Sequence, residues 1–144
     1  MIRHVAGVAE IVDDIDAAVQ FYRENLGLEV DHTSGEGYAS VSISGVPHFG
    51  IWLRSKAAEI LFGNPAQTDR IALGFTLGFE VDSVAEAESS LRKGSTNVIQ
   101  GSKLEPWGQQ TARFLSPSGA LCEVSETPAA RRIAQNLEVE SGAQ

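Results

Sequence analysis

The chain has 144 residues, a hydrophobic fraction of 42% and a formal net charge of −8 at pH 7. This acidic balance argues against binding to nucleic acid or to anionic membranes, and no apolar run approaches the roughly 20 residues of a membrane span. The one cysteine, Cys122, excludes an intramolecular disulfide. Because the N-terminal segment also lacks the charged-then-apolar order of a signal peptide, we expect a cytoplasmic protein.

Hydrophobic patterning predicts four strands in the first half of the chain, at residues 5–12, 28–33, 38–43 and 48–53. Between the first two strands, Asp14 is predicted to cap a helix that ends at Gly27. Tyr22 lies on the apolar face of this helix, so we expect it in the core. The first half therefore has the order strand, helix, three strands.

The second half repeats this order, with strands expected at residues 71–81, 96–100, 110–115 and 120–125. Ser83 and Glu86 have the spacing of a capping box, and the helix that follows is expected to stop at Gly94. Residues 54–70 break the pattern and are interpreted as a connection. A βαβββ unit that recurs after about 70 residues indicates two equivalent modules that pack together.

Four stretches resemble the signature of one superfamily: Asp14 to Tyr22 followed by Leu26-Gly27-Leu28, Gly78 to Asp82, Pro106-Trp107-Gly108, and Ser116 to Glu123. They are similar to the two modules of the vicinal-oxygen-chelate superfamily, which includes glyoxalase I, extradiol dioxygenases, fosfomycin-resistance enzymes and bleomycin-resistance proteins. The match covers roughly residues 4–127.

The resemblance implies an α+β fold in which two tandem βαβββ modules form a curled mixed sheet with a cleft, helices on its outer face, usually as a homodimer. We expect one domain over residues 1–127, with module one at 4–54, a linker at 55–70 and module two at 71–127. Residues 128–144 are expected to form a C-terminal helix and a frayed tail, with Pro128 at a first helical position.

In the enzymes of this superfamily, four cleft side chains hold a divalent metal. The resemblance places these positions at Gly7, Trp52, Thr76 and Glu123, of which only Glu123 is a good ligand. Zinc and non-haem iron sites use three protein ligands, so the sequence predicts neither a metal nor another cofactor.

An alternative stays open, because a bulge in the first strand could turn His4 or Glu10 toward the cleft. With His48 and Glu123, such a displaced metal site would support a glyoxalase-like lyase or a dioxygenase. By simple alternation, however, Glu10 lies on the helix-facing side of its strand.

Alternation and the loop before the seventh strand give the residues expected to bind a ligand, with no catalytic residue among them: Tyr38, Ser40, His48, Trp52, Thr76, Trp107, Arg113 and Glu123. Trp52 is either a stacking platform or filler, and Glu123 is either free or paired with Arg113. The leading hypothesis is a non-catalytic, bleomycin-resistance-like protein that sequesters a small planar or cationic aromatic molecule such as an antibiotic. A third hypothesis, beside this binder and the metal-dependent enzyme, is an interaction module whose cleft is filled by its own side chains.

Overall fold

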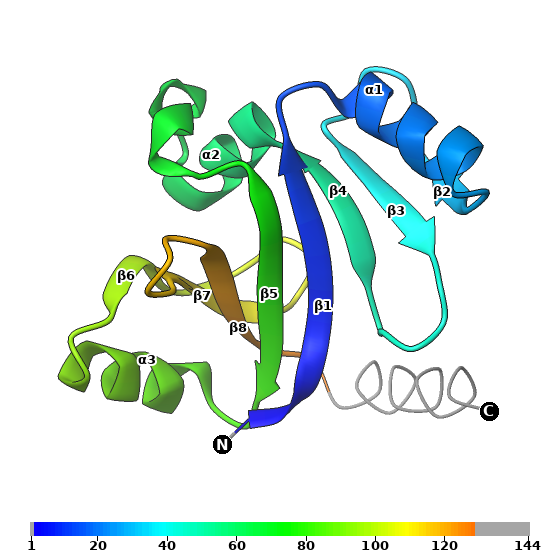
Figure 1. Ribbon diagram of the computed structural model, residues 1–144. Coiled ribbons are helices and arrows are strands. Elements are labelled where there is room, and N and C mark those ends of the chain that lie inside the picture. Colours follow the sequence, from blue (N-terminus) through cyan, green and yellow to red (C-terminus); the bar gives the residue numbers. More distant parts are fainter. Residues whose placement is uncertain (1, 129–144) are drawn as a thin grey trace.

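The computed structural model describes residues 2–128. Within them, eight strands form one mixed sheet in the order β2-β3-β4-β1-β5-β8-β7-β6 (Figure 1). The strands are β1 (Ile2–Val12), β2 (Glu29–Asp31), β3 (Tyr38–Ser42), β4 (Phe49–Leu53), β5 (Gly74–Val81), β6 (Asn97–Leu104), β7 (Gln110–Leu115) and β8 (Leu121–Glu126).

The two halves of the sheet have the same topology. β1 runs parallel to β4, β5 runs parallel to β8, and β1 and β5 pair antiparallel at the centre of the sheet. The α+β fold class and the repeated βαβββ order are therefore confirmed. β1 carries two register shifts against β5, one between Ile2 and His4 and one between Val5 and Gly7. These shifts decide which of its side chains face the cleft.

Each module carries one helix, and local sequence fixes both helix starts. The side chain of Asp14 accepts the N–H of Ala17 before α1 (Ile15–Gln20), which continues as a π-helical turn at Phe21–Asn25. Ser83 accepts the N–H of Glu86 before α3 (Val84–Lys93). Both N-caps match the sequence prediction, because short side-chain oxygens satisfy the unpaired N–H groups of a first helical turn.

The connection expected at residues 54–70 is instead helical, which corrects the sequence prediction. It contains α2 (Arg54–Phe62) and a 3-10 helix (Pro65–Arg70). The residue before α2 is Leu53, which makes no capping hydrogen bond. The usual start signal is therefore missing, and tertiary packing of Ala57, Ala58 and Leu61 holds the helix.

Other boundaries also differ from expectation. β1 begins at Ile2 rather than at residue 5, and β5 begins at Gly74 rather than at residue 71. β6 extends to Leu104, although we expected this strand to end at residue 100. The expected C-terminal helix falls almost entirely on residues 129–144, outside the described part of the chain. Over residues 2–128, none of the helices combines the length and the apolar character that crossing a membrane requires.

The core consists of three hydrophobic clusters. One packs α1 and its π-helical turn on the first module and includes Tyr22, which is buried as expected. A second packs α3 on the second module. The third joins Ala57, Ala58 and Leu61 of α2 to Ile11 and Leu121. Since Leu121 lies two residues before Glu123 on β8 and shares its face, α2 covers one end of the cleft face.

Candidate functional site

Strand registers place four residues side by side across the middle of the cleft face. Gly7 of β1 pairs with Gly78 of β5, and Gly78 pairs with Glu123 of β8. On the other side of β1, the N–H of Val8 bonds the carbonyl of His48, and a Cβ added to Gly7 would lie 3.2 Å from the Cβ of His48. We call His48, Gly7, Gly78 and Glu123 the central row.

The two glycines leave the centre of this row without side chains. Gly78 sits where an added Cβ would meet only Gly7 backbone atoms at 3.5 and 3.8 Å and the Cβ of Glu123 at 4.0 Å. Glycine inside a strand often marks a place where a ligand or another backbone approaches closely. The bare backbone thus separates an imidazole on one side from a carboxylate on the other.

The first-module side of the central row is an aromatic pair. The hydroxyl of Tyr38 bonds Nε2 of His48, and the two rings are nearly parallel at 8°. Gly50 makes this possible, because an added Cβ there would lie 2.5 Å from the Tyr38 hydroxyl. Burial, and more weakly the charge of Glu123, raise the pKa of Tyr38 to about 12 against the opposing effect of a bond with Ser40. Tyr38 therefore stays neutral beside His48.

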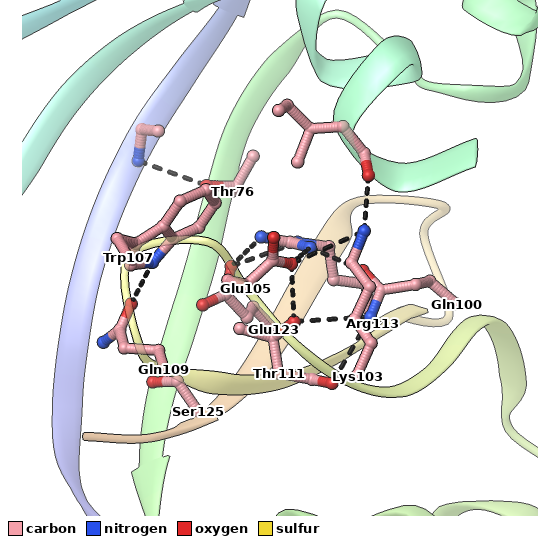
Figure 2. A network of polar contacts seen from close by, with 12 residues as sticks. Thr76, Gln100, Lys103, Glu105, Trp107, Gln109, Thr111, Arg113, Glu123 and Ser125 are labelled. Carbon is pink, nitrogen blue, oxygen red and sulfur yellow. Dashed lines mark hydrogen bonds and ion pairs between the residues drawn. The ribbon is translucent and has the colours of Figure 1, made fainter. Parts of the chain in front are cut away.

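The second-module side is a charged network around Arg113 (Figure 2). Arg113 is 2% exposed, and its Nε and Nη2 both lie 3.1 Å from Oε2 of Glu123. Its Nη1 donates to Oε1 of Gln100 at 2.5 Å and to Oε1 of Glu105 at 2.9 Å. No hydrogen bond within the described chain reaches Oε1 of Glu123, whose side chain is 29% exposed. This oxygen is available to a ligand.

Glu105 holds the network together from inside the protein. It is 3% exposed and accepts the hydroxyl of Thr111 at 2.9 Å, while Nζ of Lys103 lies 3.6 Å away. Lys103 also donates to the carbonyl of Ile60 at 2.5 Å, which ties the network to α2. A buried carboxylate needs such partners, so Glu105 and Arg113 form a fixed support for Glu123.

Burial raises the pKa of Glu123. The Arg113 guanidinium opposes this effect, but the negative charges of Glu105 and Glu80 act in the same direction as burial. Glu80 itself is fully buried, and its carboxylate accepts the N–H and the hydroxyl of Thr127 at 2.8 and 3.0 Å. Glu123 is consequently the exposed member of a group of three carboxylates.

A family model described as "Glyoxalase-like domain" matches residues 6–128. The chain belongs to this family. Its membership of the vicinal-oxygen-chelate superfamily, expected from the four motifs, is thereby confirmed. No curated protein sequence matches the chain significantly.

Solved structures share the glyoxalase-like fold at low sequence identity. A variant of Streptomyces coelicolor methylmalonyl-CoA epimerase, in complex with 2-nitronate-propionyl-CoA, has a TM-score of 0.61 at 19% identity, covering 90% of this chain and 100% of that one. A glyoxalase/bleomycin resistance protein/dioxygenase superfamily member from Vibrio splendidus 12B01 has a TM-score of 0.57 at 17% identity, covering 88% and 100%. A hypothetical protein, BH1468 from Bacillus halodurans C-125, has a TM-score of 0.60 at 18% identity, covering 87% and 94%.

The cleft of this glyoxalase-like chain does not fit a catalytic metal. The central row offers one imidazole and one carboxylate, whereas zinc and non-haem iron sites need three protein ligands. Within residues 2–128, no three His, Cys, Asp or Glu side chains gather as a metal-binding group. Two residues were weighed as displaced ligands. His4 does face the cleft through a bulge in β1, but it joins no such group within residues 2–128. Glu10 faces the helix side and accepts the hydroxyl of Tyr22 at 2.5 Å.

The structure also changes the alignment of the expected ligand positions. Trp52 pairs with Ile11, further along β1 than Gly7, and Thr76 pairs with Ala9. The registers therefore bring His48 and Gly78 into the central row in place of Trp52 and Thr76. From Val8 to Ile11, β1 pairs with both neighbours without a shift. The difference therefore lies in how the strands are aligned with one another, which alternation within a single strand does not reveal.

The remaining expected ligand-binding residues have these places. Trp52 packs against the α2 cluster, and its ring centroid lies 5.7 Å from Cζ of Arg113. The hydroxyl of Thr76 accepts the N–H of Ala9. Trp107 is 44% exposed and donates to Gln109 at 2.8 Å. Ser40 pairs with Gly50 on the neighbouring strand. Of these, Trp52 lies against the charged network, on the cleft side.

Sequence reasoning missed three members of the network: Gln100, Lys103 and Glu105. A register shift in β6 falls between Gln100 and Lys103, so two residues an odd number apart turn to the same side. Period-two alternation predicts opposite sides for them. A buried Glu directly before Pro106 gave no signal of its own.

A further groove of about 380 Å³ lies outside the cleft, along α1 and the loop after β2. Among its lining residues are Asp16, Gln20, Arg23, Glu24 and His32. Arg23 donates to the carbonyl of Val30 at 2.7 Å, and Gln20 donates to Glu24 at 3.2 Å. These bonds occupy the long polar side chains of Arg23 and Gln20 within the protein. We therefore treat the groove only as a possible competing binding site for a ligand of the cleft.

Proposed function

We propose that this protein binds a small, flat, cationic organic molecule over Gly7 and Gly78, with Glu123 as its anchor. The observation that carries the proposal is the unused Oε1 of Glu123 beside a stretch of bare backbone. A planar group can lie on backbone that carries no side chains, and a nitrogen cation can donate a charge-assisted hydrogen bond to the carboxylate.

The electrostatics around Glu123 support a cation. Besides burial, the negative charges of Glu105 and Glu80 raise the pKa of Glu123, so a positive ligand at Oε1 would relieve repulsion among the carboxylates. Burial strengthens this attraction. We assign the flat surface to the backbone and to Tyr38 rather than to Trp52, because the guanidinium of Arg113 already lies over the Trp52 ring.

We infer that binding itself is the activity, as in sequestration of an antibiotic-type compound by a cytoplasmic homodimer. Over residues 2–128, the cleft lacks the donor set of a metal-dependent lyase or dioxygenase. A buried support of Gln100, Glu105 and Arg113 holds Glu123 in one position, which suits a rigid binding site because pre-organised groups lose little entropy when a ligand binds.

A second candidate is an acid–base enzyme that moves a proton without a metal. The observation in its favour is the bond between Tyr38 and His48 on the opposite side of the central row from Glu123. Groups with displaced pKa values on two sides of one site can exchange protons with a bound ligand.

Fluorescence titration tests the proposal directly, because Trp52 and Trp107 are the two indoles of the chain. We expect benzamidine, a flat amidinium, to change the fluorescence saturably at one site per chain. Glu123→Gln should weaken binding about 10- to 100-fold through loss of a charged hydrogen bond. Glu86→Gln, on the exposed side of α3, is the matched control and should leave the affinity unchanged.

The same titration with planar aromatic antibiotics and with Ni²⁺, Zn²⁺, Fe²⁺ and Mn²⁺ separates the alternatives. Stoichiometric metal uptake without benzamidine binding would replace the proposal with metal chemistry. Deuterium appearing in a bound ligand in D₂O, measured by NMR, would favour the acid–base enzyme over simple binding.

A further inference from the structure

His4 faces the cleft because β1 contains a bulge. His4 pairs with Glu80, and Gly7 pairs with Gly78, so two intervening residues on β1, Val5 and Ala6, lie opposite one on β5, Phe79. Regular alternation would turn His4 and Gly7 to opposite faces, and the extra residue returns them to the same one. His4 therefore lies in the row of Glu80 and Ser125, next to the central row.

The ring of His4 has an unsatisfied nitrogen. Nε2 is buried and has no hydrogen-bond partner, the one side-chain atom of this kind found in residues 2–128. Leaving a buried polar atom unpaired is costly, and such atoms are rare in native proteins. Glu80 is turned to other partners, since Ser125 and Thr127 donate to its carboxylate at 2.8 to 3.3 Å.

Two polar atoms without hydrogen bonds to other residues of the described range 2–128 thus occupy neighbouring rows of the cleft: Nε2 of His4 and Oε1 of Glu123. Neighbouring rows are about 7 Å apart along the strands, and β1 and β8, which are two strands apart, are separated by about 10 Å. The Cα atoms of His4 and Glu123 are therefore about 12 Å apart on a flat sheet. A single aromatic ring with a substituent at each end matches the space between two such side chains.

We propose that His4 is a second ligand contact, which recognises a hydroxyl or carbonyl group at the end of the ligand opposite its cationic nitrogen. This inference rests on the proposed function and specifies its ligand class. An anionic group is disfavoured at His4, because the carboxylate of Glu80 lies on the paired position of β5 and would repel it. A hydroxyl suits either tautomer of the imidazole, since it both donates and accepts.

The test compares benzamidine with 4-hydroxybenzamidine by fluorescence titration and calorimetry. For the wild-type protein, we expect the hydroxyl to improve affinity about 3- to 10-fold, the value of one neutral hydrogen bond. His4→Phe should reduce this ratio to about one. His32→Phe is the matched control, because His32 bonds the carbonyl of Glu36 on the outside of the molecule, and it should keep the wild-type ratio.

A second readout uses the wild-type protein alone, in case His4→Phe does not fold. In long-range ¹H–¹⁵N spectra, 4-hydroxybenzamidine should shift Nε2 of His4, and benzamidine should not. Equal affinities for the two probes, or no shift at His4, would overturn this inference and leave the proposed function standing. Failure of both probes to bind would overturn both.

Discussion

The two sides of the cleft have the same backbone plan and opposite chemistry. On the first-module side, Tyr38 and His48 form an aromatic pair that needs the missing side chain of Gly50. On the second-module side, Arg113 and Glu105 form a buried ionic support for Glu123. The duplicated βαβββ topology therefore repeats positions rather than side chains.

This difference assigns separate tasks to the two modules. The ionic side fixes one carboxylate and leaves one of its oxygens available to a ligand. The aromatic side supplies a neutral surface, because Tyr38 with its raised pKa carries no charge at neutral pH. Between them, Gly7 and Gly78 provide the space. The predictions below disturb first one side and then the other.

The largest effect is expected from Arg113→Met. This change leaves Glu105 buried beside only Lys103 and Thr111, and breaking a buried ion pair costs about 3–5 kcal/mol of unfolding free energy. Arg3→Met is the control, because Arg3 forms an exposed pair with Asp82 that contributes at most about 1 kcal/mol. Urea denaturation measures both, and equal losses for the two variants would contradict the role of the ionic support.

Gly50→Ala tests the aromatic side. The new methyl group would lie 2.5 Å from the Tyr38 hydroxyl and 3.0 Å from two ring carbons, and such overpacking costs about 1–3 kcal/mol. Gly101→Ala is the control, since its nearest contacts are 3.5 Å away. In a Tyr38→Ala background the cost of Gly50→Ala should vanish. A cost that persists would mean that the ring is not what excludes a side chain there.

Glu88 gives the stability of the second module a pH dependence that can be measured. It accepts the N–H and hydroxyl of Ser102 at 2.6 and 2.7 Å and Nε of Arg92 at 2.8 Å. These bonds lower its pKa from 4.5 to about 2. Because the folded-state pKa is the lower one, the stabilisation is complete above the unfolded value and is lost as pH falls toward 2.

Glu88→Gln should therefore be less stable than wild type by about 1–2 kcal/mol at pH 6. The difference in stability should close between pH 4.5 and about 2. Thermal denaturation of both proteins across that pH range measures it. A gap that stays constant over this window would show that the charge of Glu88 does not stabilise the fold.

Mutation of the helix caps is expected to have the smallest effect on stability, and to have nearly the same effect in both modules. Asp14→Ala and Ser83→Ala each remove one bond to a first-turn N–H and should each cost about 1 kcal/mol. Ser89→Ala, at an exposed position within α3, should be neutral or slightly stabilising. Clearly unequal costs for the two caps would show that the modules depend differently on their helices.

Local signals were enough for the strands and the two capped helices. Alternation along residues 38–43 and the cap at Ser83 depend on neighbouring residues alone. α2 was missed because Leu53 provides no cap and the helix is held by distant contacts with Ile11 and Leu121. A helix that tertiary packing stabilises leaves little trace in sequence.

The site was predictable in part for the same physical reason. Alternation on β7 and β8 correctly put Arg113 opposite Glu123. The bulges in β1 and β6 move His4 and Lys103 to faces that alternation does not assign to them. Strand register and its shifts depend on pairing between distant strands, so the central row and the buried network required the structure.

The most direct test of the central claim is a crystal structure of the protein with benzamidine. We predict the ring over Gly7 and Gly78, with an amidinium nitrogen about 2.8 Å from Oε1 of Glu123, the length of a charge-assisted bond. Density for benzamidine in the outer groove beside Asp16 and Arg23, with the central row empty, would contradict the account.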